Sequence, residues 1–456
     1  MKNSKFLVRA ALIALLAIVC IAANAQTTWY VTGQGNDAND GRSEKTAFRS
    51  LQKAADLVGP GDVVLVGDGL YTKDDRSSGS AVVLIRRSGA PDAWITWKAL
   101  PGQHPVVRPT GWGGITIQAS YHIIDGIDVI GRNDELTLKD AIKDLSNNSP
   151  DPTFNSNGIF VEGRPCPPDA KPHHVIVRNC TVAKCPGGGI TGIETDYLTV
   201  EDCKVYNNAW YMRYAGSGIT LLNNWAFDNK PGYHVIIRRN LVWNNKCFVS
   251  WERIGKLSDG NGILLDVTNQ DGLNLANPED LLPGEEETPV VPGKGGRPIW
   301  TNKALIANNV SAYNGGSGIH TFRTCNVDIV NNTTYWNGTN VGYEEIFSNA
   351  SINVTIMNNI MVPRPGGAVT SNHRNQGLKW DYNLYPVEQN VVAGPHDIVA
   401  DPQFVNPGID LSTADFSLLK SSPAVGAATD ELVMDEDITG RKRPKGKAAD
   451  LGAYER

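Results

Sequence analysis

The sequence predicts an all-β chain folded as a right-handed parallel β-helix. The first observation is a recurring pattern in which an alternating apolar strand runs into an asparagine or aspartate and then continues as a second strand. The second is a set of Gly-Ile pairs that open strands. The third is composition: 46 glycines, 26 prolines and only 20% charged residues are typical of a turn-rich β protein, and a hydrophobic fraction of 41% excludes a disordered chain.

The polar turn recurs at regular intervals. Successive copies are 23, 38, 69, 23, 27 and 24 residues apart, and we interpret 69 as three periods of 23 and 38 as one period with a 15-residue insertion. A period near 23 fits one coil of about three short strands, with equivalent positions stacked about 4.8 Å apart. Stacked amide side chains would then hydrogen-bond along the ladder and satisfy buried turn groups. The positions are Asn179, Asp202, Asn240, Asn309, Asn332, Asn359 and Asn383.

The Gly-Ile pairs indicate which side chains face the core. Glycine suits a sharp bend, and the isoleucine after it would point inward. Strand alternation places the next side chain outward. The pairs begin at Gly158, Gly189, Gly218, Gly262 and Gly318, and the outward positions that follow in the later coils are Leu264, His320, Phe347 and Thr370.

The N-terminus is typical of a secretory signal peptide. Residues 1–25 combine a basic start, an apolar run too short to span a bilayer, and Ala-Asn-Ala before Gln26. We expect cleavage near Ala25 and a secreted or periplasmic protein. No later segment approaches the apolar length of a membrane span.

The remaining chain divides into a β-helix over 26–400 and an irregular C-terminal cap over 401–456. Apolar residues at helical spacing near the start predict a short amphipathic helix that caps the first coil, formed by Phe48, Leu51, Ala55 and Val58. Two long interruptions, 132–155 and 268–300, are expected to wall a functional face. The net charge of −6 argues against a nucleic-acid partner. We expect a monomer.

Three stretches resemble secreted right-handed β-helix proteins of the pectate-lyase-like kind, and polysaccharide lyase family 9 in particular. They are the opening TTWYVTGQGNDANDGRSEKTAFRSLQKAADLVGPGDVVLVGDGLYT, the coils with GNGILLD and GGSGIHTF, and the closing SSPAVGAATDE and DLGAYER. The resemblance implies calcium-dependent β-elimination on a uronate-containing, pectin-like polysaccharide, with a lysine as the base. That lysine belongs in a GNGFKL stretch, and here its position holds Leu264. Either another residue removes the proton or this chain performs different chemistry.

His320 and Arg323 are the candidates for the elimination chemistry. β-Elimination needs a partner for the uronate carboxylate, a base for the adjacent proton, and a route to protonate the leaving oxygen. Arg323 would neutralise the carboxylate and His320 would be the base, because an imidazole of ordinary pKa, about 6.5, titrates near working pH. Lys256 is the remaining lysine candidate. A surface histidine with only local hydrogen bonds is the alternative interpretation.

Carboxylates near the GNG stretch suggest two further roles. Asp259 and Asp266 bracket it and, with oxygen ligands from the acidic loop, would bind Ca²⁺. They are equally compatible with turn-forming aspartates. Glu344 and Glu345 begin the coil after His320, and pairing Glu345 with Asp259 or Asp266 would suit a glycoside hydrolase.

Aromatic and charged residues nearby are candidates for substrate binding, because aromatic rings beside polar groups commonly stack on sugars. They are Trp251, Glu252, Arg253, Arg213, Tyr214 and Phe322. The sequence therefore predicts a lyase acting on an acidic polysaccharide. A β-helix glycoside hydrolase and a non-catalytic carbohydrate-binding protein remain alternatives.

Overall fold

A computed structural model describes residues 26–268, 297–298, 300–444 and 448–456 of the chain. The expected signal peptide, and most of the acidic interruption that begins after Thr268, lie outside the described residues.

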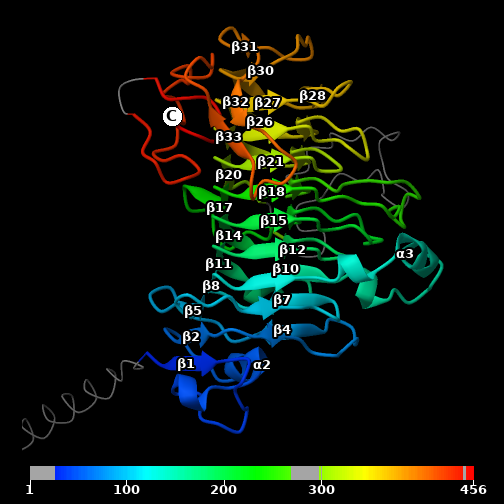
Figure 1. Ribbon diagram of the computed structural model, residues 1–456, viewed down its shortest axis with the longest axis vertical. Helices are drawn as coiled ribbons and strands as arrows, with labels where there is room; N and C mark the ends of the chain where they lie inside the picture. Colours follow the sequence, from blue (N-terminus) through cyan, green and yellow to red (C-terminus); the bar gives the residue numbers. More distant parts are fainter. Residues whose placement is uncertain (1–25, 269–296, 299, 445–447) are drawn as a thin grey trace, which may run out of the picture.

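The described chain winds into a parallel β-helix with three long faces, which we call sheets A, B and C (Figure 1). From β4 to β30, each coil contributes one strand to each face, in the order C, A, B. The buried apolar side chains of all three sheets form one continuous core. Sheet A contains β1 (Thr28–Val31), β2 (Val63–Val66), β5 (Ile95–Ala99), β8 (His122–Asp125), β11 (His173–Arg178), β14 (Asp196–Glu201), β17 (Tyr233–Arg238), β20 (Lys303–Ala307), β23 (Cys325–Val330), β26 (Ile352–Met357) and β29 (Lys379–Asp381). Sheet B contains β3 (Leu70–Tyr71), β6 (Val106–Val107), β9 (Asp128–Ile130), β12 (Thr181–Ala183), β15 (Lys204–Tyr206), β18 (Leu241–Trp243), β21 (Val310–Ala312), β24 (Thr333–Tyr335), β27 (Ile360–Val362), β30 (Leu384–Tyr385) and β31 (Ile398–Val399). Sheet C contains β4 (Ala81–Ile85), β7 (Gly113–Ile117), β10 (Asn157–Glu162), β13 (Ile190–Ile193), β16 (Ile219–Leu222), β19 (Ile263–Asp266), β22 (Ile319–Phe322), β25 (Ile346–Asn349) and β28 (Thr370–His373).

An asparagine ladder fixes the turn between sheets A and B, as predicted. The backbone and side-chain amides of Asn240 both donate to Asn309 Oδ1 at 3.0 Å, and the pattern continues through Asn332 and Asn359 to Asn383. All five side chains are fully buried. The ladder ends where Asn383 donates its backbone amide to Asp397 at 2.9 Å.

Two details of the predicted register are wrong. Asn179 and Asp202 lie one residue before the ladder, in the left-handed backbone region, and Cys180 and Cys203 occupy the ladder position itself. The 69-residue interval is a single coil, not three, because Asn240 bonds directly to Asn309 and β17 pairs with β20. The extra residues of that interval are insertions within one coil.

A second asparagine ladder, not predicted, runs through the turn between sheets B and C. Asn208, Asn245, Asn314 and Asn337 are linked by the same paired amide bonds at 2.9 to 3.1 Å. The sequence signal is the repeat of an asparagine five residues after each of Asn240, Asn309 and Asn332. The coils between Asn240 and Asn337 therefore have two of their corners held by buried amide chains.

The Gly-Ile pairs behave as predicted. The isoleucines of the five pairs, at 159, 190, 219, 263 and 319, lie in register on sheet C with Ile346 of the next coil, and all six are fully buried. A Cβ on Gly262 would lie 2.0 Å from Ser311 Oγ, so only glycine fits there. The prediction that Thr370 faces outward is wrong. Thr370 pairs with Ile346 and faces inward, and Ser371 is the outward residue beside Phe347.

A short helix is present where the spacing predicts one. The helix α2 (Leu51–Ala55) begins at Ser50, whose hydroxyl accepts the backbone amide of Lys53, and it packs on β1 and β4. Phe48, Leu51, Ala55 and Val58 are all buried in the common core. The longer helix α3 (Leu138–Asp144) lies in the first interruption and stands away from the sheets in Figure 1. Three-residue 3₁₀ turns occur at Glu44–Thr46, Asn133–Glu135, Pro152–Phe154 and Pro168–Ala170.

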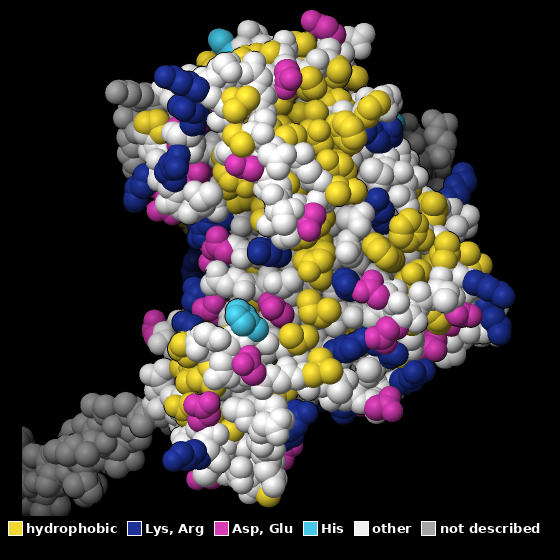
Figure 2. Space-filling model, viewed as in Figure 1, with side chains coloured by type: hydrophobic (Ala, Val, Ile, Leu, Met, Phe, Trp, Pro, Cys, Tyr) yellow, Lys and Arg dark blue, Asp and Glu magenta, His cyan; other side chains and the backbone are white. Residues whose placement is uncertain are grey.

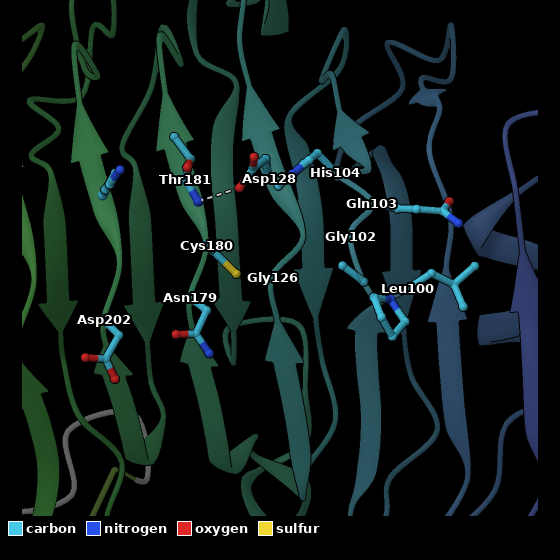
Figure 3. Close-up of a pocket in the computed structure, with 13 residues that line it drawn as sticks. Leu100, Gly102, Gln103, His104, Gly126, Asp128, Asn179, Cys180, Thr181 and Asp202 are labelled. Atoms are coloured by element: carbon cyan, nitrogen blue, oxygen red, sulfur yellow. Dashed lines mark hydrogen bonds between the residues drawn. The ribbon is translucent and has the colours of Figure 1, made fainter. Parts of the chain in front are cut away.

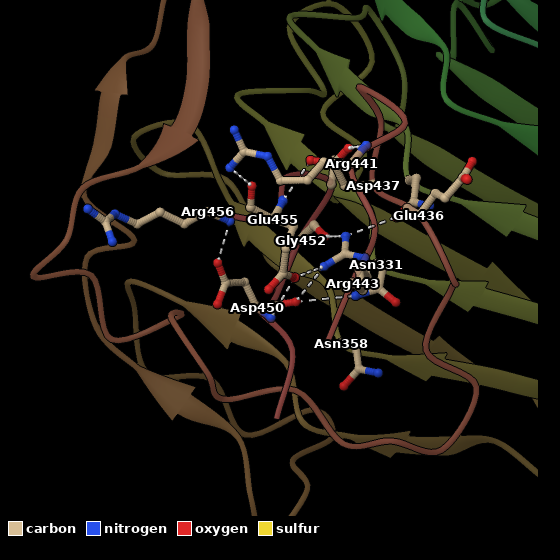
Figure 4. A network of polar contacts seen from close by, with 12 residues as sticks. Asn331, Asn358, Glu436, Asp437, Arg441, Arg443, Asp450, Gly452, Glu455 and Arg456 are labelled. Atoms are coloured by element: carbon tan, nitrogen blue, oxygen red, sulfur yellow. Dashed lines mark hydrogen bonds and ion pairs between the residues drawn. The ribbon is translucent and has the colours of Figure 1, made fainter. Parts of the chain in front are cut away.

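The C-terminal segment runs back along the flank of the β-helix. It includes the antiparallel hairpin of β32 (Phe404–Asn406) and β33 (Asp415–Leu418), and its apolar residues pack on sheet B. Hydrophobic side chains gather on that part of the surface in Figure 2. Buried Arg443 donates to Asn308 and to the carbonyl of Gly452, and Asn331 donates to the carbonyl of Asp450 (Figure 4). That this segment shields the last coil remains a prediction.

Candidate functional site

The outer face of sheet C carries most of the residues predicted for the elimination chemistry. His320 pairs in register with Leu264 on β19 and with Phe347 on β25. Two positions further along the strands, Asp266 pairs with Phe322. His320 and Asp266 therefore project from the same face of neighbouring strands, which the proposed chemistry requires.

His320 lies in an apolar environment. Its ring stacks on Phe347 with centroids 4.5 Å apart and meets Tyr343 edge-on at 5.7 Å. The side chain is 8% exposed, and neither ring nitrogen has a hydrogen-bond partner. Burial lowers the pKa of His320 to about 3, so the imidazole is neutral at working pH but is a weak proton acceptor.

Unpartnered polar atoms gather around Phe347. Besides the two nitrogens of His320, Asn349 Oδ1 and Ser371 Oγ are buried without a hydrogen-bond partner. Ser371 pairs with Phe347 in register, and Asn349 follows two residues along the same strand on the same face. Buried polar groups normally have partners, so this concentration marks a place where a bound molecule or water would complete the bonding.

Arginines lie along the edge of sheet C that leads to sheet A. Arg323 follows β22 and Arg374 follows β28, both in the left-handed region and at equivalent positions of their coils. The Arg323 guanidinium lies over the Phe322 ring, 4.8 Å from its centroid. The role of Arg323 as a carboxylate partner remains a prediction.

Arg297 is a residue that sequence reasoning missed. It is 6% exposed, donates to the carbonyl of Val267 at 3.3 Å, and has a buried Nε without a partner. Burial lowers its pKa to about 10, while the nearby carboxylates of Glu194 and Asp266 act in the opposite direction. No sequence pattern signals Arg297, and its bond to Val267 and its proximity to Asp266 become visible only in the structure.

The opposite edge of sheet C carries carboxylates. Asp259 accepts hydrogen bonds from Ser258 Oγ at 2.9 Å and from Asn261 Nδ2 at 3.1 Å. Burial raises the pKa of Asp259 to about 6, and it also raises the pKa of Glu344. Both carboxylates lie near Tyr343, whose own pKa is raised mainly by burial.

The described residues do not fit a calcium site at the predicted pair. Asp259 precedes β19 and Asp266 ends it, and four strand residues alone span about 10 Å. One Ca²⁺ with ligand distances of about 2.3 to 2.6 Å cannot bridge that separation. Among the described residues, no three His, Cys, Asp or Glu side chains are placed to hold a metal ion.

Glu345 does not face this surface. It occupies the register position of Gly318, is 1% exposed, and ends the second asparagine ladder by accepting the backbone amide of Asn337 at 2.7 Å and its side-chain amide at 2.6 Å. Burial raises the pKa of Glu345 to about 8. The proposed pairing of Glu345 with Asp259 or Asp266 is therefore wrong, because both its oxygens are used inside the turn.

Arg213 and Glu252 bind each other rather than an open surface. Their side chains form an ion pair at 2.5 Å, and buried Arg213 also donates to the carbonyls of Asp144, the last residue of α3, and of Leu145 and Asn147 beyond it. A cation suits these carbonyls because they are at the negative end of the helix dipole. Arg213 therefore holds the first interruption to the loop before β16, and its predicted role in substrate binding is replaced by a structural one.

The other predicted residues of this region lie in the loop between β18 and β19 or beside it. Tyr214 is half-buried next to Arg213, and burial raises its pKa. Trp251 is half-buried, with the Arg253 guanidinium 5.9 Å from its ring centroid. Lys256 is exposed and its carbonyl accepts the Trp251 backbone amide at 2.8 Å. No described contact brings Lys256 to His320.

A hollow of about 400 Å³ lies on another side of the molecule, near the turn between sheets A and B (Figure 3). Its lining includes His104, Asp128, Lys204 and Asp202. Asp128 accepts the backbone amide of Thr181 at 2.7 Å, and burial raises its pKa. None of the residues predicted for the site lines this hollow.

Comparison with known proteins identifies the family. The model of the Pel9A-like right-handed β-helix region matches residues 29–359. The chain belongs to this Pel9A-like family. The pectate lyase Pel9A has a crystal structure that matches with a TM-score of 0.54 at 18% identity, covering 94% of this chain and 96% of that one. The predicted resemblance and the parallel β-helix are thereby confirmed.

Two further solved structures are similar to the chain. A rhamnogalacturonan lyase matches with a TM-score of 0.46 at 15% identity, over 84% of this chain and 91% of its own. A lacto-N-biosidase from Eubacterium ramulus matches with a TM-score of 0.38 at 15% identity, over 82% and 67%. At such identities a structural match shows the fold alone. None of the curated proteins matches the chain. Within the described residues, no helix has the length and apolarity to cross a bilayer.

Proposed function

We propose that this Pel9A-like protein binds an acidic polysaccharide on the outer face of sheet C and cleaves it by β-elimination. The observation that carries the proposal is the edge of arginines, Arg297, Arg323 and Arg374, beside aromatic rings and unpartnered polar groups. Cations at one edge suit a uronate carboxylate, and rings with hydrogen-bonding groups suit the sugar.

Arg297 and Arg323 would lower the activation free energy of β-elimination by binding the uronate carboxylate. Carboxylate neutralisation makes the adjacent proton more acidic, and a partly buried guanidinium does this more strongly than an exposed one. The unpartnered Nε of Arg297 supplies a donor for this purpose. No step is assigned to calcium, because Asp259 precedes β19 and Asp266 ends it.

The base is proposed to be His320, acting as a neutral imidazole. Its ring nitrogens are unpartnered, so either is available to a substrate, but a pKa of about 3 limits the rate it would provide. Replacing His320 with Phe keeps the ring and removes the nitrogens. A turnover reduced by orders of magnitude supports the base, and an unchanged turnover removes it and leaves Lys256 as the candidate.

A glycoside hydrolase is the second candidate, and the carboxylates near Tyr343 favour it. Asp259, with a pKa of about 6, has the protonation of a general acid near neutral pH, and Glu344 would be its partner. A non-catalytic carbohydrate-binding protein is the remaining alternative.

One assay distinguishes these functions. A panel of acidic polysaccharides is incubated with the mature protein, and both ultraviolet absorbance of unsaturated uronate products and new reducing ends are measured. Elimination raises both signals, whereas hydrolysis raises only reducing ends. Binding to the panel without either signal would contradict both catalytic proposals.

The proposed polysaccharide substrate agrees with an exported protein. We propose a secreted or periplasmic monomer that begins at Gln26 after cleavage. N-terminal sequencing of the protein from culture fractions and its mass in solution test these two points.

A further inference from the structure

Phe347 is surrounded by neutral hydrogen-bonding groups. His320 stacks on one side of its ring, Ser371 is its register partner on the other side, and Asn349 follows on the same strand. His320 is more than nine-tenths buried, and all three side chains have polar atoms without partners. Phe347 and Asn349 are themselves half-buried, so part of the ring and of the amide faces outward.

This arrangement favours an uncharged sugar over a uronate with a free carboxylate. The imidazole, amide and hydroxyl each donate or accept without carrying charge, and the ring offers an apolar face. A carboxylate placed on the Phe347 ring would lose water, and the carboxyl of Glu344, which interacts with Ser371, lies nearby. The arginines lie instead at the sheet A edge, after the ends of β22 and β28.

We infer that Phe347, with Asn349 and Ser371, forms a subsite for an uncharged sugar ring, which we call the neutral subsite, while His320 on the neighbouring strand serves the adjoining uronate. The inference rests on the proposed function, because the neutral subsite lies beside the arginines that would bind a uronate. The preferred polymer would then contain uncharged rings next to acidic ones, and not uronates alone. An uncharged ring is either a neutral sugar or a uronate whose carboxyl is esterified.

Binding to three matched polymers tests the neutral subsite. They are polygalacturonate, its methyl ester with part of the carboxyls left free, and a polymer that alternates galacturonate with rhamnose. We expect at least one polymer with uncharged rings to bind about tenfold more tightly than polygalacturonate, since two or three added hydrogen bonds amount to that. The ester and the alternating polymer distinguish the two sources of an uncharged ring.

Two variants locate the effect. Asn349→Ala and Phe347→Ala should each abolish the preference for polymers with uncharged rings over polygalacturonate. Thr220→Ala, which removes a hydroxyl from the same face of sheet C on β16, should keep the preference. Circular dichroism checks that each variant is folded.

The outcomes separate the two proposals. Equal affinity of the wild-type protein for all three polymers, or a preference that survives in both Asn349→Ala and Phe347→Ala, overturns the neutral subsite and leaves the proposed function standing. Failure to bind any of the three polymers overturns the proposed function and the neutral subsite together.

Discussion

Glu345 should make the protein less stable as pH rises. Its pKa is 4.5 in the unfolded chain and about 8 in the folded one, so the folded protein binds the extra proton between these values. The free energy of unfolding therefore falls as pH increases through this window. At about 1.4 kcal/mol per unit, the loss is about 3 kcal/mol by pH 7 and about 5 kcal/mol when complete.

Glu345→Gln removes this titration while keeping an oxygen for the two amides of Asn337. The free energy of unfolding is measured with urea at several pH values between 5 and 8. Plotted against pH, it should fall less steeply in the variant than in the wild-type protein, by about 1.4 kcal/mol per pH unit. Exposed Glu388 offers the control, because Glu388→Gln should reproduce the wild-type slope. Equal slopes for Glu345→Gln and wild type would refute the assignment of a protonated carboxyl at the end of the ladder.

Three other substitutions test the remaining contacts. Arg213→Ala should lower the free energy of unfolding by about 2 kcal/mol and make residues 132–155 susceptible to limited proteolysis. Lys139→Ala, on the exposed side of α3, is the control and should do neither. Equal cleavage of the two variants would contradict the structural role of Arg213. Asn332→Ala should lower the free energy of unfolding, measured with urea, by at least about 3 kcal/mol, because it leaves buried backbone groups without partners. A decrease below about 1 kcal/mol would argue against a stabilising ladder. Arg297→Ala should lower kcat/KM on uronate polymers by about tenfold to a hundredfold with partial rescue in Arg297→Lys, and an unchanged kcat/KM would exclude it from the site.

The coil and the orientation of its strands were predictable because they depend on local chemistry. An asparagine with an apolar strand on each side, and a glycine before an inward isoleucine, each describe one turn of the chain. The same locality explains the errors. Asn179 lies one residue before the ladder, and Cys180 occupies the ladder position itself. This assignment depends on hydrogen bonds between coils, which no single segment of sequence contains.

The site was predictable only where it lies on strands. Register placed His320 and Asp266 on one face, as alternation requires. Arg297, Arg213 and Glu345 were missed or misassigned because their roles depend on contacts that long loops and turns create. Periodicity says nothing about where an insertion folds back.

The directly bonded pair Asn240 and Asn309 shows that this scaffold tolerates large additions between rungs. The direct bond between Asn240 and Asn309 keeps the two neighbouring coils in register. Loops above the surface are therefore free to lengthen, shorten or change sequence without altering the strands beneath. Proteins of this family can therefore change the segments inserted between strands, and with them the ligand that is bound, while the buried asparagines keep the coils in register.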